Sequence, residues 1–290
     1  MATDRPVPAD EAAGSADGPA SPPEAPPRSQ PNKPPAEPRS RAELYADLRA
    51  ADQPPGAGRP TDDAHTTPDG GWSWKGLRLD PAANHVADQQ LAARRAAEGR
   101  HPDGNYDDHG LTPALRRVEA QLDHGTLIPD TEKFALKSPD RFKEKLAKMI
   151  RTEPDRPATD LASGIHDGIR YTYVIGFDHY SSGVDRVRQL LRGEGYEPVA
   201  FKPSWSGHEY KGINSRWRDP ASGQCFEVQF HTPDSWEAKQ QTHDAYEKIE
   251  SPQTSPAERA RLREYQQRIS AQVPIPPAAL DFRPFKEREE

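Results

Sequence analysis

A short segment in the C-terminal third of the chain alternates apolar and polar side chains in the manner of a β-strand. It reads Phe226-Glu227-Val228-Gln229-Phe230-His231-Thr232. Because side chains alternate between the two faces of a strand, the apolar ones face a core, and Glu227, Gln229 and His231 share the opposite face. A carboxylate fixed in the middle of a rigid strand, on its non-core face, suits a metal ligand or a general base.

The N-terminal part of the chain is too rich in proline to form a packed core. Of the 32 prolines, 15 lie in residues 1–70, and the whole chain is only 33% hydrophobic with a mean hydropathy of −1.00. We therefore expect residues 1–70 to be a disordered, proline-rich arm. No apolar run approaches the roughly 18 residues of a membrane helix, and the N-terminus lacks the apolar region of a Sec signal peptide. We expect a cytoplasmic protein, with export by another route left open.

The charge and the cysteine content of the chain argue against several classes of ligand and site. The formal net charge of −7 argues against electrostatic binding of long nucleic acid. Residues 131–250 alone carry 18 Lys and Arg against 19 Asp and Glu, so phosphate recognition has to come from local clusters. The single cysteine, Cys225, excludes an internal disulfide and a zinc site with several cysteines.

Helix and strand signals alternate from about residue 75 to residue 275 and predict one α/β domain. A capping box at Ser40 predicts a short helix to Leu48. Further helices are expected at 80–99, 112–125, 138–149, 158–164, 184–193 and 255–274, with one long helix from Thr232 that carries Trp236, His243 and Tyr246. Strands are expected at 169–175, 198–202, 211–218 and 224–230, the last two joined as a hairpin.

A basic helix face is the second candidate for chemistry. Arg141, Lys145 and Lys148 follow an i, i+4, i+7 spacing and share one face. Lys137 and Ser138 stand just before this helix, where free backbone N–H groups favour anions. The group resembles a cradle for a polyphosphate; the alternative is the solvated face of an amphipathic helix.

Two more segments carry candidate residues. Asp167 precedes the strand that holds Arg170, and it is either a cation ligand or an ordinary turn aspartate. The segment from Lys202 to Asn214 includes Tyr210, which offers a ring for stacking on a base, and Gly212, which lets a backbone approach a ligand. His243, on the helix that follows the Glu227 strand, is placed to close the site.

The order of these motifs resembles the synthetase domain of RelA/SpoT-type nucleotide pyrophosphokinases. The resemblance covers about residues 130–272, and its specific part is the Glu-Val-Gln strand. The pattern Asp-x-x-Arg-Tyr-Thr (Asp167 to Thr172), combined with Phe-Glu-Val-Gln-Phe-His-Thr-Pro, looks most like actinobacterial and toxin-associated relatives. The expected organisation is then the arm, a helical N-terminal extension over 71–129, a synthetase domain over 130–275 and a tail over 276–290.

The resemblance implies a nucleotidyltransferase-like mixed β-sheet flanked by helices. It also implies Mg²⁺-dependent transfer of pyrophosphate from ATP to the 3′-hydroxyl of an acceptor nucleotide, either GDP/GTP or ADP/ATP. Asp167 and Glu227 would hold the metal, and Glu227 would take the proton of the attacking hydroxyl. The residues implied for ATP phosphates are Lys137, Ser138, Arg141, Lys143, Lys145 and Arg170. Those implied for the acceptor are Lys202, Tyr210, Lys211, Asn214, Gln229, His231 and His243.

The chain departs from the family pattern at two places. The better-known synthetases place the aspartate five residues before the arginine, where this chain has Ile165, so Asp160 stands as an alternative to Asp167. Their Tyr-Arg-Ser-x-His segment is replaced by Tyr210-Lys211-Gly212-Ile213-Asn214, so the acceptor base cannot be transferred.

The sequence supports four hypotheses about function. The first is an alarmone synthetase, with a toxin role and an immunity protein as partner among its variants. The second is a pyrophosphokinase acting on the tRNA 3′ end, which the near-neutral domain charge disfavours. The third, suggested by His166-Asp167 and His243-Asp244, is a metal-dependent phosphohydrolase, which is disfavoured because the first pair enters a strand. The fourth is a non-catalytic nucleotide-binding module.

Overall fold

The structure is a computed structural model that describes residues 64–101, 103–251 and 254–287. These residues belong to the second of the two units into which the chain divides, residues 38–290. The helix expected after Ser40 and most of the proline-rich arm lie outside the described residues. No helix within the described ranges has the length and apolar character that a membrane span requires.

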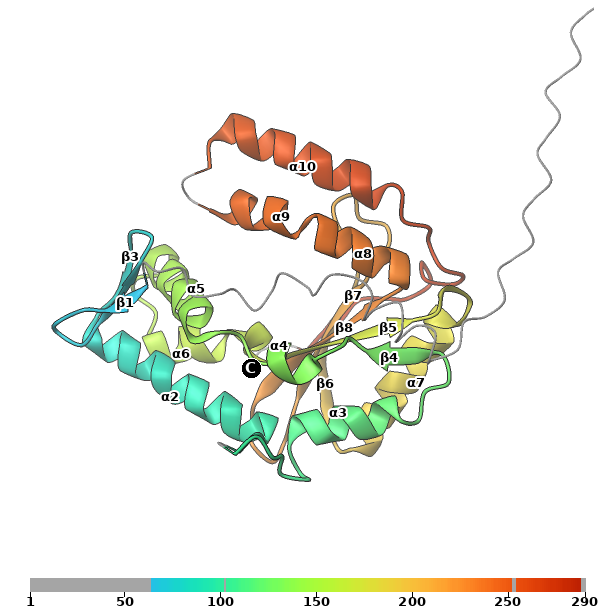
Figure 1. The fold of residues 1–290 in the computed structure, drawn as a ribbon, viewed down its shortest axis with the longest axis horizontal. Helices are drawn as coiled ribbons and strands as arrows, with labels where there is room; N and C mark the ends of the chain where they lie inside the picture. Colours follow the sequence, from blue (N-terminus) through green and yellow to red (C-terminus); the bar gives the residue numbers. More distant parts are fainter. Residues whose placement is uncertain (1–63, 102, 252–253, 288–290) are drawn as a thin grey trace, which may run out of the picture. The chain divides into compact units, whose positions relative to one another are not determined.

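A mixed six-stranded sheet forms the centre of the fold (Figure 1). Its strands run in the order β4-β5-β8-β7-β6-β9, and only the β5–β8 pair is parallel. The strands are β4 (Gly125–Leu127), β5 (Arg170–Ile175), β6 (Glu197–Pro203), β7 (Ile213–Arg218), β8 (Cys225–His231) and β9 (Phe285–Lys286). The predicted mixed α/β sheet is confirmed, as is the hairpin that joins β7 to β8.

The two faces of the sheet are covered by different helices (Figure 1). Tyr173 of β5 and Phe226 of β8 are fully buried in one core with α3 (Leu111–Glu119) and α7 (Tyr180–Gly193). On the other face, Val174 packs against Trp236 of α8 (Pro233–Gln241). Helices α9 (His243–Glu250) and α10 (Pro256–Ser270) pack against each other beyond α8. The alternation therefore predicted the apolar face of β8 correctly, whereas Gln229 and His231 on the opposite face are buried as well.

A second core lies under a small three-stranded sheet. That sheet consists of β1 (His65–Thr66), β2 (Trp72–Trp74) and β3 (Leu77–Leu79), and it packs with α2 (Pro81–Glu98), α5 (Pro139–Thr152) and α6 (Ala158–Ser163). Lys75 and Gly76 both have positive φ, as a two-residue hairpin turn between β2 and β3 requires. The indole of Trp72 donates to Asp140 at 3.0 Å, which ties this hairpin to the start of α5.

Helix boundaries follow the capping signals closely. Asp80 accepts a hydrogen bond from the backbone N–H of Ala83 at the start of α2, and Gly99 ends that helix in the left-handed conformation. Ser138 caps α5, and Ser255 caps α10, in each case with proline at the first turn. Three short helical elements were not predicted, namely α4 (Thr131–Phe134) and the 3₁₀ turns η1 (His166–Gly168) and η2 (Phe177–His179).

Three sequence expectations are corrected. The long helix after Thr232 is two helices, because the chain turns at Thr242, whose hydroxyl donates to the carbonyl of Ala238. The extension over 71–129 is not wholly helical, since it contains β2, β3 and β4. Strands β4 and β9 join the main sheet from outside residues 130–275, so the predicted boundaries do not coincide with the edges of that sheet. Strands of two or three residues carry too little alternation to be recognised in a sequence.

Candidate active site

The parallel register of β5 with β8 places the two central charged residues side by side. Arg170 is the Cα partner of Glu227. The Nε atom of Arg170 donates to Oε1 of Glu227 at 2.7 Å, and its Nη2 atom contacts Oδ2 of Asp167 at 3.0 Å. The guanidinium of Arg170 thus lies between two carboxylates that are 60 residues apart in the chain. The Glu227 side chain is 20% exposed, so it lies at the surface of the sheet and not in a packed interior.

Asp167 is surrounded by three cations. Its Oδ1 atom contacts Nζ of Lys145 at 2.7 Å, and its Oδ2 atom contacts Nζ of Lys137 at 3.1 Å as well as Arg170. Burial alone would raise the pKa of Asp167, but Lys137, Arg170 and Lys145 together hold it well below the usual value. Burial in turn lowers the pKa of Lys137 in spite of its carboxylate partner. The carboxylate of Asp167 is therefore ionised at neutral pH.

The turn that carries Asp167 is built around a buried arginine of α2. Arg94 donates from Nη2 to the carbonyls of Ala162 and Ile165, at 3.0 and 3.2 Å. Gly168 lies so close to Arg94 that an added Cβ atom would stand 2.4 Å from Nε. Asp167 itself lies in a single 3₁₀ turn, η1 (His166–Gly168), immediately before β5. Sequence analysis missed Arg94, because a basic residue in an alanine-rich helix looks like an exposed one.

The basic residues of helix α5 contact different partners. Lys145 reaches Asp167, as the polyphosphate-cradle hypothesis requires, whereas Lys148 pairs with Glu144 within the helix at 3.0 Å. Arg141 contacts Glu144 at 3.0 Å and Glu247 of α9 at 2.5 Å. Lys143 turns to the other side of the helix and contacts Asp88 of α2 at 2.7 Å. Ser138 uses its hydroxyl to cap the helix. Lys137 and Lys145 are therefore the two lysines of this group that join Asp167.

Glu227 has a second partner on its own strand. The Nε2 atom of Gln229 donates to Oε1 of Glu227 at 2.6 Å, and Nζ of Lys239 donates to Oε1 of Gln229 at 2.5 Å. Both contacts to Glu227, from Arg170 and from Gln229, use Oε1 and neither uses Oε2. A chain of hydrogen bonds therefore runs from α8 through β8 to Arg170 and Asp167. Sequence analysis singled out Gln229 but not Lys239.

The residues implied for the acceptor do not all meet. The hydroxyl of Tyr210 lies 2.9 Å from Oδ1 of Asn214 and 2.9 Å from Nε2 of His231. His231 is fully buried, and its other ring nitrogen lies 2.9 Å from the hydroxyl of Ser235. Burial, together with Lys239, keeps the pKa of His231 well below its ordinary value, so the ring is neutral. These contacts join Tyr210 to Asn214 of β7 and to His231 at the C-terminal end of β8.

The remaining acceptor candidates lie around this group. Lys211 donates to the carbonyls of Trp205 and Gly207, both at 2.8 Å, and so shapes the loop before β7. Lys202 is exposed on β6, in register with Asn214. His243 lies 3.3 Å from Glu247, the same carboxylate that contacts Arg141. Of the three, only His243 is linked to α5, and that link runs through Glu247.

Magnesium fits the donor set around Arg170, although the described ranges hold no group of three or more His, Cys, Asp or Glu side chains that could bind a metal. Mg²⁺ needs only one or two protein carboxylates when substrate phosphates and water complete its shell. Asp167 and Glu227 are two carboxylates that contact one guanidinium and so lie close together, and they would hold the ion if it displaced some of their present cationic partners. Asp160 does not, since its exposed side chain on α6 contacts the hydroxyl of Thr159. The geometry therefore favours Asp167 over Asp160.

Comparison with known proteins finds similar solved structures but no matching family. No protein-family model matches the chain, and no curated protein sequence matches it. The chain is similar to the small alarmone synthetase 1 of Bacillus subtilis bound to its product pppGpp, with 14% identity and a TM-score of 0.43 over 63% of this chain and 91% of that one. It is also similar to a GTP pyrophosphokinase family protein of Streptococcus pneumoniae, with 14% identity and a TM-score of 0.42 over 67% and 90%.

Proposed function

We propose that this protein transfers pyrophosphate from ATP to the 3′-hydroxyl of an acceptor nucleotide and so makes alarmones of the (p)ppGpp or (p)ppApp type. The observation that carries the proposal is the bridge from Glu227 through Arg170 to Asp167, beside Lys137 and Lys145. It joins two carboxylates to three cations, of which Lys137 directly precedes α5 and Lys145 lies on that helix. That combination suits a polyphosphate that carries a metal ion.

The cations would bind and orient the donor. Lys137 and Lys145 are held by Asp167 at 3.1 and 2.7 Å, so their positions are fixed before a triphosphate arrives. Fixed cations of this kind stabilise the charge of the transferred group without a reorganisation cost. Arg170 would contribute a third positive charge between the phosphates and Glu227. Arg141 would reach the donor only by exchanging its contact with Glu247 for one with phosphate.

Glu227 would act as the general base. The acceptor 3′-oxygen attacks the β-phosphorus of ATP, the bond from that phosphorus to the α,β-bridging oxygen breaks, and AMP leaves. The proton of the 3′-hydroxyl passes to the Glu227 carboxylate, where Oε2 is the oxygen not used by Arg170 or Gln229. When bound, Mg²⁺ held by Asp167 and Glu227 would spread the negative charge of the β- and γ-phosphates.

The direct test is an acceptor panel. Wild-type protein is incubated with ATP, Mg²⁺ and each of GDP, GTP, ADP and ATP, and the products are separated for AMP and for 3′-extended nucleotides. Glu227→Gln keeps the shape of the side chain but removes the base, so product formation should fall by about 10²-fold or more. Glu237→Gln makes the same change at an exposed position of α8 and should leave turnover unchanged. Absence of AMP and of any extended nucleotide with every acceptor, in wild type, overturns the proposal.

Two other functions appear as distinct outcomes of the same test. Labelled tRNA in place of the nucleotides would acquire a 3′-pyrophosphate if the acceptor were an RNA end. Nucleotide binding that survives in both wild type and Glu227→Gln, with no turnover in either, would identify a binding module. A toxin role adds a separate expectation, namely growth arrest on expression that Glu227→Gln abolishes and that a cognate immunity protein neutralises.

A further inference from the structure

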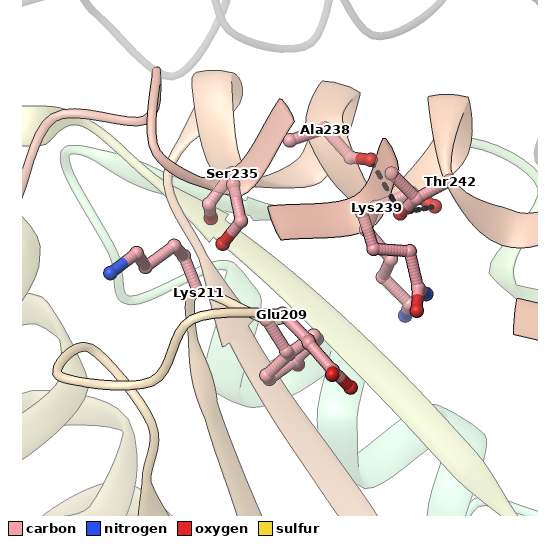
Figure 2. A pocket seen from close by; sticks show the side chains of 9 residues that line it. Glu209, Lys211, Ser235, Ala238, Lys239 and Thr242 are labelled. Atoms are coloured by element: carbon pink, nitrogen blue, oxygen red, sulfur yellow. Dashed lines mark hydrogen bonds between the residues drawn. The ribbon is translucent and has the colours of Figure 1, made fainter. Parts of the chain in front are cut away.

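A half-buried lysine of α8, Lys239, lies at the end of the hydrogen-bond chain that reaches Glu227. Nζ of Lys239 donates to Oε1 of Gln229 at 2.5 Å, and it stands 4.7 Å from the centre of the Trp236 ring. Figure 2 shows Lys239 with Ser235, Ala238 and Thr242 along one side of a small pocket, facing the segment of Glu209 and Lys211. The cavity measures about 10 Å³, which is room for about one water molecule. This cavity is too small for a nucleotide.

Covering the ammonium of Lys239 with protein costs free energy of desolvation. Within the described residues no carboxylate contacts the ammonium directly to offset this cost. Burial lowers the pKa of Lys239 to about 7, with Arg170 adding to the effect and Glu227 opposing it. The other titratable groups near Lys239 are His231 of β8, whose pKa Lys239 helps to lower, and the pocket residues Glu209, Tyr210 and Lys211. If this side chain served only to fill space, methionine could fill the same space without the cost of desolvating a charge.

The donor from Lys239 fixes which way the amide of Gln229 points. A glutamine amide has one acceptor end and one donor end, and the two are nearly equal in shape. In its protonated form Lys239 can only donate, and in that form it holds the carbonyl end of Gln229 toward α8. The NH₂ end must then face Glu227, to which it donates at 2.6 Å. With Oε1 held by Gln229 and Arg170, the rotation of the Glu227 carboxylate is fixed.

We propose that Lys239 is a positioning residue of the reaction: it orients Gln229, and Gln229 holds Glu227 so that Oε2 faces the acceptor hydroxyl. The kinetic part of this inference rests on the proposed function. Lys239 reaches Glu227 only through Gln229, whereas Lys137 and Lys145 contact Asp167. Its loss should therefore lower the rate of the chemical step and leave ATP binding intact.

The test combines kinetics with a measurement that needs no turnover. Lys239→Met should lower kcat by about 10- to 100-fold, as the loss of an orienting partner does elsewhere, and leave the KM for ATP within about two-fold. Gln229→Leu should cause a similar loss, and the double variant should be no slower than Gln229→Leu alone, because both changes break the same chain. In nucleotide-free protein, the order parameter of the Gln229 side-chain N–H groups should fall below about 0.6 in Lys239→Met. Lys248→Met, at an exposed position of α9, controls for the loss of a lysine.

Each outcome separates this inference from the proposed function. A kcat for Lys239→Met within about two-fold of wild type, or losses that multiply in the double variant, would overturn the inference while the proposed function stands. If wild type makes no product with any acceptor, the proposed function fails. The order parameter then decides alone, and an ordered Gln229 side chain in Lys239→Met would overturn the inference as well.

Discussion

Replacing Asp167 by asparagine tests whether the three cations around it depend on its charge. The substitution keeps the size of the side chain and removes the carboxylate that contacts Lys137, Lys145 and Arg170. Removing one partner of a buried ion pair costs about 3–5 kcal/mol, because the other charge stays buried without compensation. Lys137 is the most buried of the three cations, whereas the Lys145 side chain is 42% exposed and can be hydrated. We therefore expect a loss of about 2–3 kcal/mol in the free energy of unfolding at pH 7.

The pH dependence of this loss has a definite sign. The folded-state pKa of Asp167 lies below its ordinary value of 3.8. A carboxyl group with a depressed folded pKa contributes stability that is fully present above the unfolded value and is lost as the pH falls toward the folded one. The difference between wild type and Asp167→Asn should therefore be constant from pH 7 down to about 5 and should shrink below about pH 4.

Urea unfolding at pH 7 and at about pH 3 measures both effects, with the slope of the transition as a check that the unfolded state is unchanged. Asp160→Asn is the matched control, because Asp160 is exposed and contacts its neighbour Thr159. It should change stability by less than about 0.5 kcal/mol. If Asp167→Asn costs no more than Asp160→Asn, or if its cost is the same at both pH values, the account of the Asp167 cluster is wrong.

Two further predictions concern other parts of the fold. Gly212→Ala should destabilise the protein by about 1–3 kcal/mol. Gly212 has a φ of +147°, and an added Cβ atom would lie 2.9 Å from Cε1 of His231. A melting temperature equal to that of wild type would contradict this prediction. Glu98→Gln should stabilise the protein at pH 7, because burial, offset by Thr112 and Tyr106, raises the pKa of Glu98 and so penalises its charged form. The gain should vanish as the pH falls through the raised pKa to the ordinary value of 4.5, and pH-dependent melting curves that stay parallel would refute it.

Capping signals and strand alternation made much of the fold predictable. The starts of α2, α5 and α10 were read from Asp80, Ser138 and Ser255, whose side chains cap those helices in the structure. The polar face of β8 was read from the alternation around Glu227. These features are local, because a cap or an alternating strand is specified by residues within about four positions of each other.

The parts that sequence analysis missed depend on contacts between distant segments. Thr242 gives no sign in the sequence that it divides one helix into α8 and α9. Tyr246 was expected on the same helix as Trp236, yet the two lie on separate helices, and Tyr246 is 53% exposed whereas Trp236 is buried. Arg94 and Lys239 look like surface residues of polar helices, and only the packing of α2 against α6 and of α8 against the sheet buries them. No periodicity within a helix predicts which basic residue will be covered by another element.

The register between β5 and β8 is the one long-range feature on which the whole site depends. Arg170 faces Glu227 because the two are partners in a parallel pair, and Thr172 faces Gln229 for the same reason. A shift by one residue would set Tyr171 opposite Glu227, and because side chains alternate, it would turn either the charged residues or the buried tyrosines to the wrong face. The buried side chains Tyr171, Tyr173 and Phe226 exclude that shift, since their faces are fixed by the core under α3 and α7. The apolar face of the sheet thus determines where the polar face brings its charges together, and the site is a consequence of the core and not an addition to it.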